Sequence, residues 1–130
     1  MTQAANNRVV IAEDESMLRH LLRSLLKSLD YEIVAEAYDG QTAIEAVKTY
    51  KPDIVCLDIN MPGLGGLDAL ASIKTVNSDI IAIMVTGSND SAEVQQAIRT
   101  GADGYILKPF SGLQIHQAIQ KARQRRQQAG

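Results

Sequence analysis

The sequence has no tryptophan, a single cysteine and few aromatic residues, and each shortage narrows the functions open to it. Cys56 has no cysteine partner, and its place in an apolar run predicts a small buried side chain in a reducing compartment. Aromatic residues make up 4% of the chain, which argues against a flavin carrier because the flavin ring usually needs aromatic shelter. No apolar run approaches the roughly 20 residues that cross a bilayer, so we expect no membrane span.

The chain also lacks a strong excess of charge of either sign. The net charge is −2, which gives no overall reason to expect a nucleic acid or an acidic membrane surface as partner. Residues 1–7 are polar and lack the apolar core of a signal peptide, so we expect a disordered N-terminal segment and a cytoplasmic protein. The 130 residues suit one domain, expected over residues 8–124, with a short C-terminal tail at 125–130.

Five short apolar runs alternate with five stretches of helical spacing. The runs predict strands at 8–12, 31–36, 54–57, 80–85 and 104–107. Asp39, Asp90 and Ser111 have the residue types and spacing of helix N-terminal caps. The alternation predicts a doubly wound α/β domain, with a parallel sheet and helices on both faces.

Three helical stretches carry further expectations. The first has a leucine stripe that includes Leu21, and the fourth is expected to bury Val94, Ala97 and Ile98. His20 and His116 fall off the apolar stripes of the first and last helices, so both are expected to be solvated. The basic residues of the last helix complement its dipole and are weak evidence for nucleic-acid binding. These are Lys121, Arg123, Arg125 and Arg126.

The run Ile54–Leu57 is the stretch around which the other elements are expected to be arranged. Its four apolar residues predict a strand buried on both faces, followed at once by Asp58. Met61-Pro62-Gly63 then forces a loop. Open α/β sheets bind ligands at the carboxyl ends of their strands, so Asp58 is the candidate reactive residue. An aspartate that only caps a turn is the alternative at this point.

Four strands end in residues that together form a specific chemical set. Glu13 and Asp14 follow the first strand, Asp58 the third, Thr86 the fourth and Lys108 the fifth. Clustered carboxylates stay ionised only beside a cation, and oxygen ligands without histidine or cysteine suit Mg²⁺. Such a site suits phosphoryl transfer, with Asp58 as the nucleophile that forms an aspartyl phosphate. The alternative is a structural network in which Lys108 neutralises buried acids.

With these residues in this order, the sequence resembles the receiver domain of two-component response regulators (CheY-like) over nearly its whole length. The resemblance rests on the acidic pair Glu13-Asp14, on Asp58 followed closely by Met-Pro, on Thr86, and on Lys108-Pro109. It implies a flavodoxin-like sheet of strand order 2-1-3-4-5. It also implies a phosphorylation-controlled switch that is a signalling domain and not an enzyme.

The resemblance assigns roles to individual residues. Asp58 would accept a phosphoryl group from a histidine kinase or a histidine phosphotransfer protein. Asp14, Asp58 and the backbone carbonyl of Asn60 would bind Mg²⁺. Lys108 would contact the phosphoryl group, and Thr86 would reorient to hold it.

Other implied features concern the output and the geometry of the site. Tyr105 would rotate after phosphorylation and reshape the face formed by the fourth helix, the fifth strand and the fifth helix. That face would bind a downstream protein or a second copy of the chain. The peptide bond before Pro109 would be cis. Many family members have aspartate at the position of Glu13, so whether Glu13 binds the metal directly or through water stays open.

A Mg²⁺-dependent aspartyl-phosphate hydrolase is the main alternative function, because it uses similar carboxylates, a threonine and a lysine. Such an enzyme also needs substrate-recognition loops or a cap. The expected connections are too short to form one. We therefore favour the switch.

Overall fold

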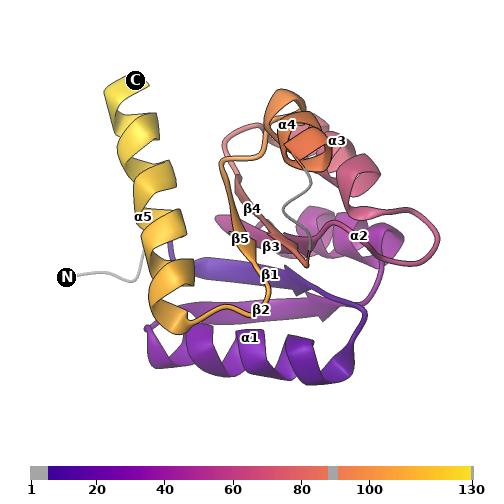
Figure 1. Ribbon diagram of the computed structural model, residues 1–130, viewed down its shortest axis with the longest axis horizontal. Helices are drawn as coiled ribbons and strands as arrows, with labels where there is room; N and C mark the ends of the chain where they lie inside the picture. The colour runs from indigo at the N-terminus through magenta and orange to yellow at the C-terminus, as the bar shows by residue number, and fades with distance from the viewer. Residues whose placement is uncertain (1–5, 88–90, 130) are drawn as a thin grey trace.

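The sheet predicted from the alternating runs is present in the computed structural model, which describes residues 6–87 and 91–129. It is parallel, with strand order β2-β1-β3-β4-β5, as the resemblance implied (Figure 1). The strands are β1 (Arg8–Ala12), β2 (Glu32–Ala37), β3 (Ile54–Asp58), β4 (Ile81–Thr86) and β5 (Gly104–Leu107). The helices are α1 (Ser16–Ser28), α2 (Gly40–Tyr50), α3 (Gly66–Val76), α4 (Ser91–Thr100) and α5 (Gly112–Ala129).

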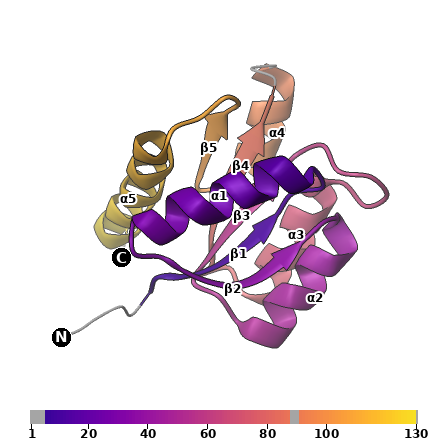
Figure 2. The same ribbon diagram turned by 90° about the horizontal axis from the view of Figure 1, so that it is seen from below.

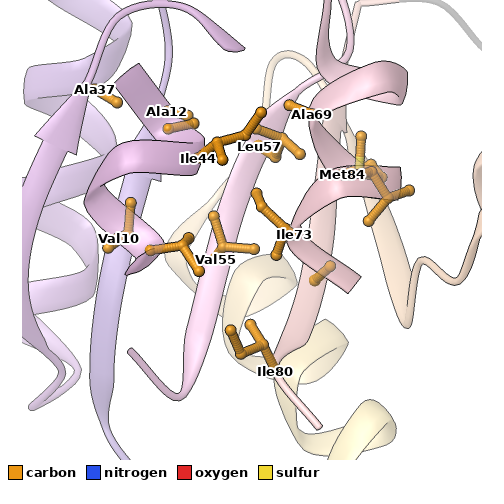
Figure 3. Packing of buried hydrophobic residues seen from close by; sticks show 14 of the residues in the cluster. Val10, Ala12, Ala37, Ile44, Val55, Leu57, Ala69, Ile73, Ile80 and Met84 are labelled. Carbon is orange, nitrogen blue, oxygen red and sulfur yellow. The ribbon is translucent and has the colours of Figure 1, made fainter. Parts of the chain in front are cut away.

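Helices cover both faces of the sheet, and alternate residues of each strand supply the two core layers. Val9 and Ile11 of β1 pack on the face covered by α1 and α5 (Figure 2). Val10 and Ala12 pack on the face covered by α2, α3 and α4 (Figure 3). Every residue of β3 is buried, so Asp58 lies at the end of a rigid central strand.

Two of the three expected helix caps are confirmed. The Asp39 side chain accepts a hydrogen bond from the Thr42 amide at 2.8 Å and closes a capping box before α2. The Gln114 amide donates to the Ser111 hydroxyl at 3.2 Å, and the Gln114 side chain accepts from the Ser111 amide at 2.8 Å. The third expected cap, Asp90, lies outside the described residues.

Two apolar residues expected to be buried in helix stripes are exposed instead. Ile98 of α4 is 50% exposed, because Ala97 forms the contact of this helix with the core. Leu21 of α1 is 43% exposed, because Leu22 and Leu26 occupy the sheet side of the helix. The exposure of Ile98 places an apolar side chain on the α4 side of β5.

Tyr31 and His116 also differ from expectation. Tyr31 was expected to begin the second strand, but β2 starts at Glu32 and the Tyr31 ring packs in the α1–α5 core layer. His116 was expected to be solvated, yet it is half-buried and its Nδ1 lies 3.4 Å from the Tyr31 hydroxyl. The Arg123 guanidinium lies 5.8 Å from the centre of the Tyr31 ring.

Contacts at both ends of the chain involve residues outside the expected bounds of 8 and 124. Residues 1–5 lie outside the described residues, but Asn7 is already held, since its side-chain amide donates to the Asp30 carbonyl at 3.2 Å. At the other end, α5 continues past the expected boundary at 124 to Ala129. Arg126 explains the extension, because its guanidinium pairs with Asp103 at 3.0 Å and donates to the Asp79 carbonyl at 3.0 Å. Among the described residues, no helix has the length and apolar character needed to cross a bilayer.

Candidate functional site

The carboxyl ends of β1, β3, β4 and β5 bring four of the predicted site residues to one edge of the sheet. Ala12 pairs with Leu57, so Glu13 follows β1 beside the end of β3. Asp58 pairs with Val85, next to Thr86 at the end of β4. The Lys108 amide donates to the Thr86 carbonyl at 2.8 Å and brings the lysine to the same edge. Positions far apart in sequence thus become neighbours.

Asp58 is almost fully buried, and both of its carboxylate oxygens are engaged. Oδ1 accepts a hydrogen bond from the Asn60 amide at 3.1 Å. Oδ2 accepts one from the Lys108 ammonium, also at 3.1 Å. The strand and these two bonds fix the carboxylate in one orientation, which a nucleophile in a transfer reaction requires.

Glu13 is the most unusual carboxyl group of the site. Its side chain is fully buried, and this burial, with a smaller contribution from neighbouring Asp58, raises its pKa to about 7. Oε2 accepts the Glu15 amide at 3.1 Å, which together with Lys108 opposes the rise. Among the described residues, none donates a well-directed hydrogen bond to Oε1, although the Lys108 ammonium lies 3.2 Å away.

Lys108 is the cation that faces both buried acids. Its partial burial alone would lower its pKa, but the carboxylates of Asp58 and Glu13 outweigh that effect and raise the pKa. The ammonium therefore stays charged at neutral pH. The following peptide bond, Lys108–Pro109, is cis as the resemblance implied.

The carboxylates at this edge fit a magnesium ion. Ligand oxygens of Glu13, Asp14 and Asp58 all lie within 4.8 Å of one another. Two of the three residues are buried and Asp14 is exposed, so the cluster opens to solvent on one side. Oε1 of Glu13 has spare acceptor capacity, and hard oxygen donors are the ligands that Mg²⁺ prefers.

Thr86 and Tyr105 lie on neighbouring strands, one inside the molecule and one at its surface. Thr86 is fully buried and pairs in the sheet with Leu107. Tyr105 pairs with Met84 and is 45% exposed, which is the partly exposed position that the switch hypothesis requires. Leu107, between Tyr105 and Lys108 along β5, is also partly exposed.

Two glycines position the loop that follows Asp58. A Cβ atom on Gly66 would overlap the Asp58 carbonyl oxygen and lie 2.7 Å from Cα of Ile59. A Cβ atom on Gly40 would likewise overlap the carbonyl of Leu64, to which the Gly40 amide donates at 3.1 Å. Neither contact has a signal in the sequence, since glycine at the first position of a helix carries no motif.

Cys56 is buried in β3, as expected, and burial raises the pKa of its thiol to about 12. The thiol is therefore protonated at neutral pH and is a packing group of the core.

The sequence is similar to a known protein family and to individual proteins. The model of the family described as response regulator receiver domain matches residues 9–120. The chain is 35% identical over 114 residues to the chemotaxis protein CheY of Thermotoga maritima, covering 88% of this chain and 95% of that protein. It is 40% identical over 119 residues to the transcriptional regulatory protein PdtaR of Mycobacterium tuberculosis, covering 92% of this chain and 58% of that protein.

A solved structure shows the same fold. The crystal structure of the CheX-CheY-BeF3-Mg²⁺ complex from Borrelia burgdorferi superposes with a TM-score of 0.83 at 27% sequence identity. The superposition covers 86% of this chain and 85% of that chain.

Proposed function

The chain belongs to the response regulator receiver domain family, and on that basis we propose that Asp58 accepts a phosphoryl group from a histidine kinase or a histidine phosphotransfer protein. The observation that carries the proposal is the Lys108 ammonium placed 3.1 Å from Oδ2 of Asp58 and 3.2 Å from Oε1 of Glu13. Receiver domains are signalling domains and not enzymes of the ordinary kind, so the phosphorylated protein is itself the product.

The transfer uses the Asp58 carboxylate as nucleophile. One of its oxygens attacks the phosphorus atom of a phosphohistidine, the O–P bond forms, and the P–N bond breaks with its electron pair going to the imidazole nitrogen. Lys108 then donates to a phosphoryl oxygen and offsets the charge that builds up there. The Thr86 hydroxyl donates to another phosphoryl oxygen after the transfer.

We propose Mg²⁺ as the cofactor, held by Asp14, Asp58 and the backbone carbonyl of Asn60, with Glu13 contributing directly or through a water molecule. When bound, the ion neutralises negative charge on the phosphoryl oxygens. The three clustered carboxylates and the spare acceptor atom of Glu13 support this assignment. The related CheY of the Borrelia burgdorferi complex was solved with BeF3 and Mg²⁺, which also supports it.

We propose that the face formed by α4, β5 and α5 carries the output. A groove of about 780 Å³ runs along it and is lined partly by Ile98, Tyr105 and Leu107. All three side chains are exposed, and Lys121 and Arg125 add positive charge to the groove. A groove that combines exposed apolar side chains with charged ones suits a protein partner, which is a downstream target or a second copy of the chain.

Phosphorylation with a small donor tests the proposal. Incubation with acetyl phosphate and Mg²⁺ should add one phosphoryl group that is stable in acid and labile in alkali, detected by intact-protein mass spectrometry. Asp58→Asn should abolish this label without unfolding the protein, because the two side chains have nearly the same shape. Asp68→Asn, which changes an exposed residue in the first turn of α3, is the matched control and should label normally. Undiminished labelling of the Asp58 variant would falsify the assignment.

A further inference from the structure

Arg19 connects the carboxylate pair to strand β2. The residue lies in the second turn of α1, and its Nη1 donates to the backbone carbonyl of Glu13 at 2.8 Å. Its Nε lies 3.5 Å from Oε1 of Glu36 on β2. One planar guanidinium thus contacts two acceptors on different elements, an arrangement that the forked donors of arginine permit.

We propose that Arg19 is a positioning residue that holds Glu13 and Asp14 in the orientation needed to bind a divalent cation with Asp58. The inference rests on the metal role proposed above for these carboxylates. It concerns the affinity of the site for the ion and assigns Arg19 no contact with the ion or with the phosphoryl group.

The hydrogen bonds of Glu13 show why a single guanidinium has this effect. The Glu13 amide donates to the Ala37 carbonyl at 3.0 Å, which extends the pairing of β1 with β2 by one residue. The Glu15 amide donates to Oε2 at 3.1 Å. The bond from Arg19 to the Glu13 carbonyl fixes the peptide unit between Glu13 and Asp14. Without it, the carbonyl of that peptide unit loses this donor, and the backbone that carries the Asp14 side chain is less restrained, while the Glu13 amide and Oε2 keep their own hydrogen bonds.

Arg23 provides an internal comparison on the same helix. Its Nη1 pairs with Oε2 of Glu36 at 3.0 Å, so both arginines share one carboxylate. The side chains are similarly exposed, at 24% for Arg19 and 30% for Arg23. Arg19 alone of the two has a hydrogen bond to the Glu13 carbonyl among the contacts of the described residues.

Loss of the Arg19 charge and loss of its hydrogen bond to Glu13 predict opposite changes in Mg²⁺ affinity. Removing a positive charge near a cation site strengthens cation binding, because it removes repulsion. Loss of a group that orients metal ligands weakens binding, typically by ten- to a hundredfold. Arg19→Gln should therefore lower Mg²⁺ affinity by about tenfold if positioning dominates. Arg23→Gln removes the same charge without touching Glu13, so its affinity should stay within about twofold of the parental value or rise.

The test is calorimetric titration of the full chain with MgCl₂ at one ionic strength, for the parental protein, Arg19→Gln, Arg23→Gln and Asp14→Ala. Amide hydrogen exchange of Glu15 in metal-free protein is the second measurement. The Glu15 amide should exchange faster in Arg19→Gln than in the parental protein, because its acceptor is the Glu13 side chain. Its exchange rate should be unchanged in Arg23→Gln.

The outcomes separate this inference from the proposed function. A parental protein that binds no Mg²⁺ would remove the proposed metal site and this inference with it. Parental binding that Asp14→Ala weakens and Arg19→Gln leaves unchanged would overturn the inference alone. An equal loss in the two arginine variants would also overturn it, since the effect would then arise from Glu36 or from charge.

Discussion

Lys108 and Asp58 form an ion pair in which the ammonium lies 3.1 Å from Oδ2 of the carboxylate. The same ammonium also faces Glu13, so one cation balances two buried acids. Removing it leaves two carboxyl groups facing each other in a poorly solvated site. Each carboxyl group must then either stay charged in this poorly solvated site or take up a proton, and either change costs free energy.

Lys108→Ala should lower the free energy of unfolding of the metal-free protein by about 2 kcal/mol at pH 8, below the range for a fully buried pair because Lys108 is partly exposed. The loss should shrink in saturating Mg²⁺, because the ion replaces the missing positive charge. Urea unfolding followed by far-UV circular dichroism measures both. Lys48→Ala, an exposed lysine of α2, is the control and should change stability by less than about 0.5 kcal/mol. An equal effect of the two variants would contradict the assigned role of Lys108.

Glu13 should make the metal-free protein less stable as pH rises. Its pKa is about 7 in the folded protein and 4.5 when unperturbed, so the folded state holds the proton more tightly over that interval. The stabilisation is therefore complete below pH 4.5 and is lost as pH rises to about 7, a change of up to about 3 kcal/mol. Glu13→Gln has no proton to lose at this position and should lack this contribution.

Urea unfolding of both proteins in EDTA at pH 5 and pH 8 measures the difference. The stability of Glu13→Gln relative to the parental protein should increase between these two values. With Mg²⁺ present the increase should be smaller, because the ion favours the ionised carboxylate. A difference that stays constant with pH would show that Glu13 titrates near its ordinary value.

Gly66 should be intolerant of even a methyl group. The added Cβ would meet the backbone of Asp58, the last residue of the buried strand β3, and of Ile59 directly after it, and this backbone cannot move away cheaply. Gly66→Ala should therefore cost about 2 kcal/mol or more and displace Asp58 enough to weaken Mg²⁺ binding. Gly65→Ala is the matched control, because its Cβ would come no closer than 3.7 Å to the Ile59 carbonyl and its φ of −75° suits alanine. Equal unfolding midpoints for the two variants would contradict the steric argument.

The strands and the candidate site could be predicted because their signals are local. The run Ile54–Leu57 is apolar at every position, which is typical of a strand covered on both faces, and the residue after such a strand lies at the sheet edge. The same reasoning placed Thr86 and Lys108. Parallel pairing then predicts that these residues are neighbours, since it brings the carboxyl ends of all strands to one edge of the sheet.

The features that the sequence did not reveal depend on tertiary contacts. The spacing of α4 gave Ile98 the same weight as Ala97, and only the position of the helix over the sheet shows that Ile98 faces outward. The raised pKa of Glu13 arises from burial, which its place in an acidic run did not suggest. The contacts of Arg19 have no local signal in the sequence, because its acceptors lie on the preceding loop and on β2.

The last prediction concerns how phosphorylation reaches the output face. Thr86 is buried at the end of β4, and Tyr105 is 45% exposed on the neighbouring strand. A phosphoryl group on Asp58 would offer new acceptor oxygens, which should draw the Thr86 hydroxyl inward, and the space it leaves should admit the Tyr105 ring. Phosphorylation can shift the population of the inward Tyr105 ring only by as much as its contacts differ in free energy between the inward and outward states.

Fluorine NMR of protein labelled with 3-fluorotyrosine can follow this movement directly, because the chain has four tyrosines. Acetyl phosphate and Mg²⁺ should shift the Tyr105 resonance, assigned with Tyr105→Phe. They should leave the Tyr50 resonance unchanged, although Tyr50 is equally exposed at 45% on α2. Thr86→Ala should still be phosphorylated but lose the Tyr105 shift, because the hydroxyl that moves is missing. A full Tyr105 shift in that variant would show that the signal reaches the α4, β5 and α5 face without Thr86. Amide exchange that changes only in the loops beside Asp58 would remove that face from the mechanism.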